Sequence, residues 1–214
     1  MTSPRARGSK AGVEGAEIIV HCAGSSKGDE DKARNLVRAA AAAGARHLVY
    51  ISVVGADRIP VVSRVDRAMF GYYASKLAAE RVVAESGVPW TTLRATQFHD
   101  LILMTARQMA RLPVIPVPAG FGFQPVDADE VAARLVELAL GTPAGLVADM
   151  AGPRVYGMAE LLRGYLRARR KRRVIVPVRL PGRAAGALRA GANLAPDRAA
   201  GGRTWEEFLA DRVA

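Results

Sequence analysis

Short apolar runs alternate with longer amphipathic stretches along most of the chain. The short runs are rich in β-branched residues and lie between glycines or prolines, as is typical of strands in a parallel sheet. We expect strands or extended segments at residues 17–23, 47–54, 90–95, 113–118, 146–149 and 174–178. We expect helices at residues 29–43, 72–86, 101–111, 127–140, 158–170, 183–192 and 204–213. This order predicts an α/β fold with a parallel sheet and right-handed crossovers.

Glycine and acidic residues mark the ends of several expected helices. Gly44 and Gly87 follow the first two helices, where a residue that tolerates a left-handed backbone is favoured. Asp127 precedes the fourth helix and is suited to cap it. Residues 55–71, between the second strand and the second helix, are expected to form a loop.

Composition favours a globular protein of a reducing compartment. Hydrophobic residues make up 50% of the 214 residues, and Cys22 is the only cysteine, so no internal disulfide can form. No apolar run reaches the roughly 18 residues of a membrane span. Residues 1–10 lack the apolar stretch of a signal peptide. We therefore expect a cytoplasmic protein with no membrane partner.

The net charge of +11 is concentrated near the C-terminus. Residues 163–203 contain twelve Lys or Arg and one acid, Asp197, and the densest part is residues 167–173. Such a cluster can bind nucleic acid. No aromatic residues interleave residues 167–173 to stack on bases, so a solvated helix end that complements the helix dipole is the preferred interpretation.

The sequence Tyr72-Tyr73-Ala74-Ser75-Lys76 is the sharpest local feature. Positions i and i+4 share one face of a helix, so Tyr72 and Lys76 are expected to point the same way. An ammonium beside a phenol lowers the phenol pKa, which suits a tyrosine to proton transfer on a carbonyl. Tyr73, three residues before Lys76, is the alternative member of the pair. No histidine lies at a spacing that would make Ser75 part of a hydrolase triad.

Six segments resemble, in order, landmarks of one family. They are EIIVHCAG, RNLVRAA, ARHLVYISVVG, YYASKLAAERVV, PWTTLRATQFHD and QPVDADEVAARLVELAL. Together they resemble atypical short-chain dehydrogenase/reductases, most closely the NmrA-like or NAD(P)H-binding group, over most of residues 12–214. The resemblance implies a tail at 1–16, a partial Rossmann-like NAD(P)-binding domain at 17–150, and a small, mostly helical substrate-side region at 151–214.

The resemblance also assigns roles to individual residues. Tyr72 matches the catalytic tyrosine, and Lys76 matches the lysine that binds the nicotinamide ribose and tunes that tyrosine. Ser52 matches the active-site hydroxyl, although Val53 is an alternative register. The remaining cofactor-binding positions that it implies are Ala23, Gly24, Ala95, Thr96 and Phe98. The asparagine of the family's proton relay falls near Asp29, where this chain has an acid instead.

A glycine-rich phosphate-binding turn is not found in its usual place. Residues 24–28 (Gly-Ser-Ser-Lys-Gly) follow a strand and precede a helix, but they lack the P-loop ending and are too short. The family normally has about 60–70 residues before Val13, which supply the first strands of a sheet ordered 3-2-1-4-5-6. We therefore expect a Rossmann-type sheet truncated at its N-terminal side. The strand at 17–23 would form an exposed apolar edge through which chains could associate.

Three histidine and cysteine positions have ordinary structural interpretations. His21 and Cys22 lie within a strand with no second cluster nearby, so we expect buried packing rather than a metal site. His99 and Asp100 could line a substrate pocket, but Asp100 as a helix N-cap is preferred.

These observations and the resemblance together predict an oxidoreductase of the NAD(P)H-binding type. Its cofactor would be NADP or NAD, and its substrate a small carbonyl or quinone-like acceptor. Two alternatives remain: a non-catalytic NmrA-like dinucleotide sensor or regulator, and an inactive truncated fragment.

Overall fold

Four parallel strands form the main sheet of the computed structural model, which describes residues 12–24 and 28–213. Their order in the sheet is β1-β2-β3-β6. The strands are β1 (Ile18–His21), β2 (His47–Val53), β3 (Trp90–Ala95) and β6 (Gly145–Leu146). All three pairings are parallel, which confirms the predicted α/β class.

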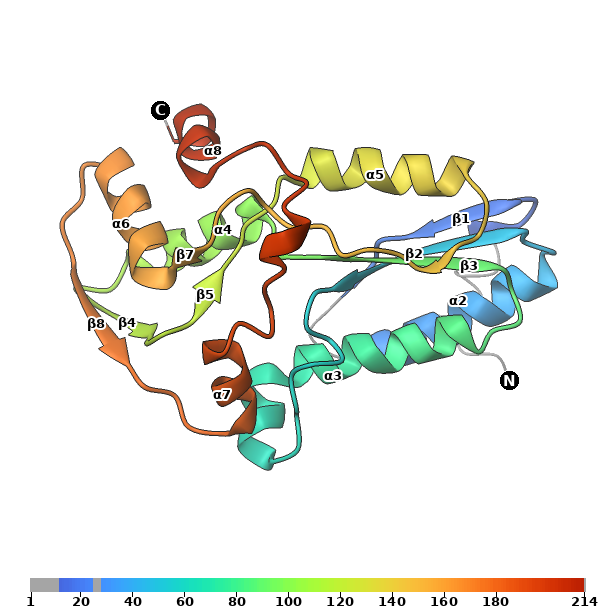
Figure 1. The fold of residues 1–214 in the computed structure, drawn as a ribbon, viewed down its shortest axis with the longest axis horizontal. Helices are drawn as coiled ribbons and strands as arrows, with labels where there is room; N and C mark the ends of the chain where they lie inside the picture. The colour runs from blue at the N-terminus through green and yellow to red at the C-terminus, as the bar shows by residue number, and fades with distance from the viewer. Residues whose placement is uncertain (1–11, 25–27, 214) are drawn as a thin grey trace.

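Helices cover both faces of this sheet (Figure 1). On one face lie α2 (Asp29–Ala42) and α3 (Arg64–Ala84), and on the other lies α5 (Ala128–Leu140). Because successive side chains of a strand point to opposite faces, β2 serves both layers. Leu48 and Tyr50 pack in the core with α2 and α3, whereas Val49 packs with α5. All three are buried, so the apolar sequence of β2 reflects a strand covered on both sides.

The C-terminal part of the chain forms a second lobe beside the sheet (Figure 1). Its elements are α4 (His99–Met109), β4 (Val114–Pro118), β5 (Gly122–Phe123), β7 (Tyr156–Gly157), α6 (Met158–Ala168), β8 (Val174–Val178), α7 (Arg183–Arg189), the 3-10 turn η1 (Pro196–Arg198) and α8 (Trp205–Arg212). Strand β4 pairs in parallel with β8, and β5 pairs antiparallel with β7. Leu161, Trp205 and Phe208 lie in the core of this lobe, which joins α4, α6 and α8.

The expected loop over residues 55–71 is wrong from Arg64 onward. Helix α3 begins there because Ser63 caps it: its hydroxyl accepts a hydrogen bond from Asp66 N at 2.9 Å. The Asp66 carboxylate accepts one from Ser63 N at 3.1 Å, which completes a capping box. Gly71 lies inside the helix and does not break it. Tyr72 is therefore in the middle of the helix and does not open it.

Smaller differences concern helix α4, residues near the N-terminus and the sheet edge. The N-cap of α4 is Phe98 and not Asp100, which lies in its first turn. Residues 1–11 of the expected tail lie outside the described residues, while Val13 is buried against α2 and α3. Strand β1 is at the edge of the sheet, where Ile18 and Val20 are 43% and 44% exposed. None of the helices described is long and apolar enough to cross a membrane.

Gly152 supplies a test of the packing between the segment before α5 and the segment after β6. A Cβ at this position would lie 1.6 Å from the carbonyl oxygen of Pro125, so the backbone would have to move. We expect Gly152→Ala to lower the free energy of unfolding by about 3 kcal/mol or more, measured by denaturant titration. Gly71→Ala is the matched control, because a Cβ there meets nothing within 4 Å. In a helix interior it should raise stability by about 0.5–1 kcal/mol. Equal stability of the two variants would contradict this packing.

Candidate functional site

A cleft of about 710 Å³ opens at the carboxyl ends of the central strands, between α3 and α4. Ligands of open α/β sheets bind at this edge. Seven of the eight residues that the sequence assigned to catalysis or cofactor binding line it. They are Gly24, Ser52, Tyr72, Lys76, Ala95, Thr96 and Phe98. Ala23 is exposed and is not among the described residues that line the cleft.

The ammonium of Lys76, in the middle part of α3, is held in a buried position. Lys76 is 3% exposed, and its Nζ donates hydrogen bonds of 3.3 Å to Tyr50 Oη and to the Ile51 carbonyl. A carboxylate oxygen of Asp29, at the start of α2, lies 3.5 Å away. Burial lowers the pKa of Lys76, and Asp29 opposes that change. Two helices and one strand therefore converge on a single amine.

Tyr72 lies one turn before Lys76 and on the same face of α3, as its spacing predicts. The Lys76 ammonium is 5.9 Å from the centre of the Tyr72 ring, and both side chains line the cleft. Tyr72 is 39% exposed. The arrangement leaves the phenol accessible to a molecule in the cleft, whereas the amine is enclosed.

The expectation that Lys76 lowers the pKa of Tyr72 is wrong. Burial, and to a smaller extent the negative charge of Asp29, raise the pKa of Tyr72 to about 12. The ammonium donates its hydrogen bonds to Tyr50 and Ile51 instead. Tyr72 therefore keeps its proton at neutral pH and is suited to act as an acid.

Ser52 lies near the carboxyl end of β2 and faces the cleft. It is 5% exposed, and its hydroxyl has no hydrogen-bond partner among the residues that the structure describes. A buried hydroxyl without a partner is costly in an empty protein and is satisfied when a polar ligand arrives. Val53, the alternative register, also lines the cleft but carries no polar group.

The segment after β3 forms the opposite wall. The Thr96 hydroxyl donates a hydrogen bond of 2.5 Å to the Gln124 carbonyl, so it is committed to the fold. Gln97, which the sequence reasoning did not single out, accepts a hydrogen bond from Gln124 N through Oε1 at 3.2 Å. Its Nε2 is buried and unpartnered among the described residues. Gln97 and Ser52 thus bring two unsatisfied polar atoms to the same cleft.

Gly24 approaches Lys76 so closely that a larger residue would disturb it. A Cβ at Gly24 would lie 3.0 Å from Lys76 Nζ and 3.4 Å from Asp29 Oδ2. Residues 25–27 of the connection to α2, within the segment 24–28 considered as a phosphate loop, lie outside the described residues.

The expectation that His21 and Cys22 are buried is wrong for Cys22. Cys22 is exposed and lines the cleft, directly after the end of β1. His21 is partly buried and stacks on Tyr50 with 5.4 Å between ring centres, and burial lowers its pKa. No group of three or more His, Cys, Asp or Glu side chains that could hold a metal occurs in the described part of the chain.

His99 belongs to the core of the second lobe and not to the cleft. It is fully buried, stacks on Trp205 and Phe208, and its Nε2 hydrogen-bonds the Arg203 carbonyl at 3.0 Å. Tyr73 does line the cleft, but it also packs against the apolar cluster of α7. Tyr50 was missed by the sequence reasoning, although it is the tyrosine that hydrogen-bonds Lys76.

Comparison with known proteins shows which family and which solved structures this chain resembles. A family model described as NAD(P)H-binding matches residues 7–139. The NADPH-dependent quinone oxidoreductase QOR2 from Escherichia coli, complexed with NADPH, is 18% identical, with a TM-score of 0.77 over 99% of this chain and 82% of that one. Citrobacter sp. triphenylmethane reductase, complexed with NADP(H), is 17% identical, with a TM-score of 0.71 over 96% and 80%.

A third structure extends the similarity to a different chemistry. A nucleoside-diphosphate-sugar epimerase from Staphylococcus aureus is 17% identical, with a TM-score of 0.69 over 95% of this chain and 80% of that one. No curated protein sequence matches. At such identities the structural matches show the fold, and they confirm the predicted Rossmann-type arrangement.

The pKa of Tyr72 can be tested by difference titration. The phenolate absorbance of the wild type minus that of Tyr72→Phe should stay near zero through about pH 11, because the Tyr72 pKa is about 12 in the folded state. The raised pKa also means that the folded state keeps this proton where the unfolded chain loses it. Its contribution to stability is therefore lost as the pH rises from about 10 to about 12. A difference signal that titrates below pH 10 would show that the ammonium controls the phenol after all.

Proposed function

This chain belongs to the NAD(P)H-binding family, and from that premise we propose that it is an oxidoreductase. It would transfer hydride between NADP(H) or NAD(H) and a small carbonyl or quinone-like acceptor. The observation that carries the proposal is the meeting of Ser52, Tyr72 and Lys76 in one cleft at the carboxyl edge of the sheet. Ser52 comes from β2, and Tyr72 and Lys76 come from α3, so one ligand in the cleft could contact all three residues.

The cleft fits the nicotinamide and ribose half of the dinucleotide. Ser52 Oγ and Gln97 Nε2 are buried polar atoms without partners among the described residues, so a carboxamide or a hydroxyl group would satisfy them. Lys76 lines the same cleft, and its ammonium would exchange one of its present contacts for a ribose hydroxyl. When bound, the dinucleotide supplies or accepts the hydride.

Tyr72 is the proton donor in this proposal. Its pKa of about 12 keeps it protonated until a carbonyl oxygen gains negative charge. Lys76 places a positive charge 5.9 Å from the phenol ring, where it would stabilise the phenolate that forms as the proton leaves. Ser52 would donate a hydrogen bond to the same carbonyl oxygen. In this proposal Tyr72 delivers the proton, Lys76 stabilises the negative charge, and Ser52 orients the carbonyl group.

Apolar side chains of α4 support an apolar acceptor. Leu101 and Met104 line the cleft and are 47% and 51% exposed, and Phe98 lies beside them. A flat, mostly apolar molecule with a carbonyl group would cover these side chains and present its oxygen to Tyr72. The quinone oxidoreductase of similar fold is consistent with that class of acceptor.

The function is tested by measuring oxidation of NADPH and of NADH with a small quinone or aldehyde. We expect Tyr72→Phe to lower kcat by about a hundredfold or more, since general acid catalysis contributes about 10²–10⁴ in rate. Binding of the dinucleotide, measured by calorimetry, should persist in this variant. Tyr73→Phe is the matched control, because it removes the neighbouring hydroxyl, and it should change kcat by less than about threefold.

The same measurements separate the alternatives. Dinucleotide binding without turnover in the wild type would replace the enzyme with the sensor or regulator. Absence of both would favour the inactive fragment. Equal losses in Tyr72→Phe and Tyr73→Phe would contradict the assignment of Tyr72 as the donor.

We also propose that β1 is a contact between chains. It is at the edge of the sheet, with Ile18 and Val20 exposed, and such an edge is a template for pairing. Val20→Lys should lower the fraction of dimer seen by sedimentation velocity, because a lysine opposes pairing of apolar edges. Val136→Lys is the control, since Val136 is 57% exposed on α5. A wild type that remains monomeric at high concentration would rule the contact out.

A further inference from the structure

The small sheet of β4 and β8 exposes an apolar face. Val114 pairs with Val174, Pro116 with Val176, and Pro118 with Val178. The four valines of this face are 40% to 61% exposed: Val114, Val174, Val176 and Val178. On the opposite face, Ile115 and Val117 are buried in the core of the second lobe. The sheet is therefore apolar on both sides, although one side is not covered by the protein.

An uncovered sheet face ordinarily carries polar side chains. Alternation between apolar and polar residues is the rule where one face meets water. Here the outward positions of both strands are valine or proline. An exposed apolar surface of this kind marks a place where something binds.

Basic side chains surround one end of this face. Residues 161–182 contain eight Lys or Arg and no acid. We call six of them, together with Arg111 from the end of α4, the basic fringe: Arg167, Arg169, Arg170, Lys171, Arg172 and Arg173. All seven are exposed, and none forms an ion pair with another residue in the described part of the chain.

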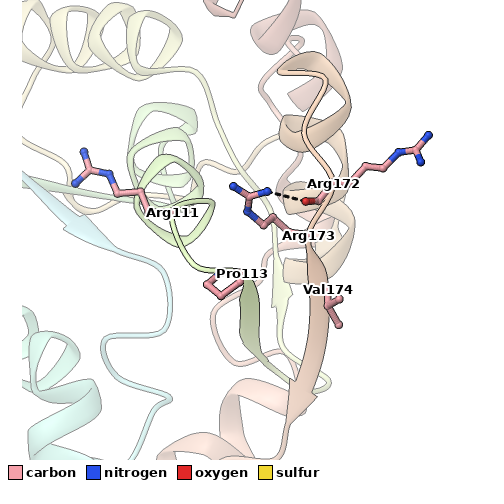
Figure 2. Close-up of a pocket in the computed structure, with 5 residues that line it drawn as sticks. All are labelled: Arg111, Pro113, Arg172, Arg173 and Val174. Carbon is pink, nitrogen blue, oxygen red and sulfur yellow. Dashed lines mark hydrogen bonds between the residues drawn. The ribbon is translucent and has the colours of Figure 1, made fainter.

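The basic fringe adjoins the apolar face at Val174, and its residues Arg167 and Lys171 line a neighbouring hollow with Ile175 and Glu160. Figure 2 shows Arg172 reaching away from the chain on the side to which Val174 points. A cavity of about 550 Å³ lies between Arg111, Arg172, Arg173, Pro113 and Val174. Arg173 is held there by a hydrogen bond of 3.3 Å from its Nε to the Ala110 carbonyl. Arginine groups thus border a hollow whose floor is partly apolar.

Arg170 occupies a backbone conformation that favours glycine. Its φ is 49°, and it is the only residue other than glycine with a positive φ in the described ranges. Lys171 N donates a hydrogen bond of 2.8 Å to the Leu166 carbonyl, so the turn that ends α6 has the Schellman form. Glycine would serve this turn without strain. The presence of arginine there fits a use for its charge.

We propose that this surface docks on an anionic lipid bilayer, with guanidinium groups on headgroup phosphates and valines in the interfacial layer. Arginine binds phosphate oxygens in a bidentate manner, and clusters of basic residues bind anionic lipid surfaces. Valine side chains gain by leaving water at the same boundary. The contact is peripheral, so it requires no spanning helix, and it departs from the expectation that the protein has no membrane partner.

Two other partners fit the surface less well. A second copy of the chain would bring the same basic fringe against itself, and like charges would repel. A nucleic acid would engage the arginines but not the valines, and the basic fringe has no aromatic side chains for bases to stack on. Charge and apolar surface together favour the lipid.

The test is co-sedimentation of the full chain with vesicles. Binding is expected to vesicles of phosphatidylcholine with phosphatidylglycerol, to be much weaker to phosphatidylcholine alone, and to fall at high salt. Inorganic phosphate at equal phosphate concentration should not compete. Equal binding to both vesicle types, or none to either, would overturn the proposal.

Two sets of substitutions separate charge from apolar contact. The triple variant Arg167→Gln, Lys171→Gln and Arg172→Gln should weaken binding about a hundredfold, since each basic side chain near an anionic surface contributes about fivefold. Val174→Ser with Val176→Ser keeps every charge and should weaken binding about tenfold or more. The charge-matched control is Arg38→Gln, Arg81→Gln and Arg134→Gln, three exposed arginines on the sheet helices, and it should change binding by less than about threefold.

Arg170→Gly gives a readout that is independent of folding defects. It should leave the melting temperature unchanged or raise it, because it removes a strained conformation, yet weaken vesicle binding about fivefold.

If a single-stranded oligonucleotide binds the chain and the valine variant binds vesicles as the wild type does, the surface is a nucleic-acid site and the lipid proposal is wrong. A shift from dimer to monomer in the valine variant without vesicle binding by the wild type would instead assign the face to a second copy.

Discussion

A buried ammonium group sets the geometry on which the cleft depends. Removing the charge of Lys76 from water is costly unless polar and charged partners surround it. The chain meets that requirement with the Asp29 carboxylate, the Tyr50 hydroxyl and the Ile51 carbonyl, which come from α2 and β2. Because Lys76 itself lies on α3, these contacts fix two helices against one strand end. Gly24 approaches the group so closely that a Cβ there would lie 3.0 Å from Lys76 Nζ.

The partners of the ammonium decide the chemistry that remains available to Tyr72. Since Lys76 donates hydrogen bonds to Tyr50 and Ile51, it influences Tyr72 only through its charge at 5.9 Å. Burial then dominates, and the phenol holds its proton in the resting state. Such a group is available as a proton donor and not as a base, and it would give up its proton only to an oxygen that has gained negative charge. In the proposed reaction, this protonation state is the one that reduction of a carbonyl acceptor requires.

The sequence was sufficient for elements that are determined locally. The spacing of apolar residues, the glycines at helix ends and the cap at Asp127 were enough to predict four elements to within a few residues. These elements are α2, β2, β3 and α5. The start of α3 was missed because Gly71 and Pro60 suggested a loop, although Ser63 and Asp66 already had the spacing of a capping box. Contacts made by tertiary structure could not be read in this way. Tyr50 meets Lys76 from 26 positions away, and the importance of Gln97 comes from an atom left unsatisfied in the fold.

Apolar strand residues proved harder to interpret than polar ones. A run of valines predicts a strand, but the pattern does not say whether a face of that strand is covered. In β2 both faces are buried, whereas β1 exposes Ile18 and Val20, and β4 and β8 expose an entire face. Strand β1 and the pair of strands β4 and β8 lie at opposite ends of the molecule (Figure 1). They differ in their surroundings: β1 offers an open backbone edge, while β8 follows a dense basic segment. A free edge is suited to another strand, and a basic, apolar face is suited to a partner that is anionic on its outside and apolar beneath.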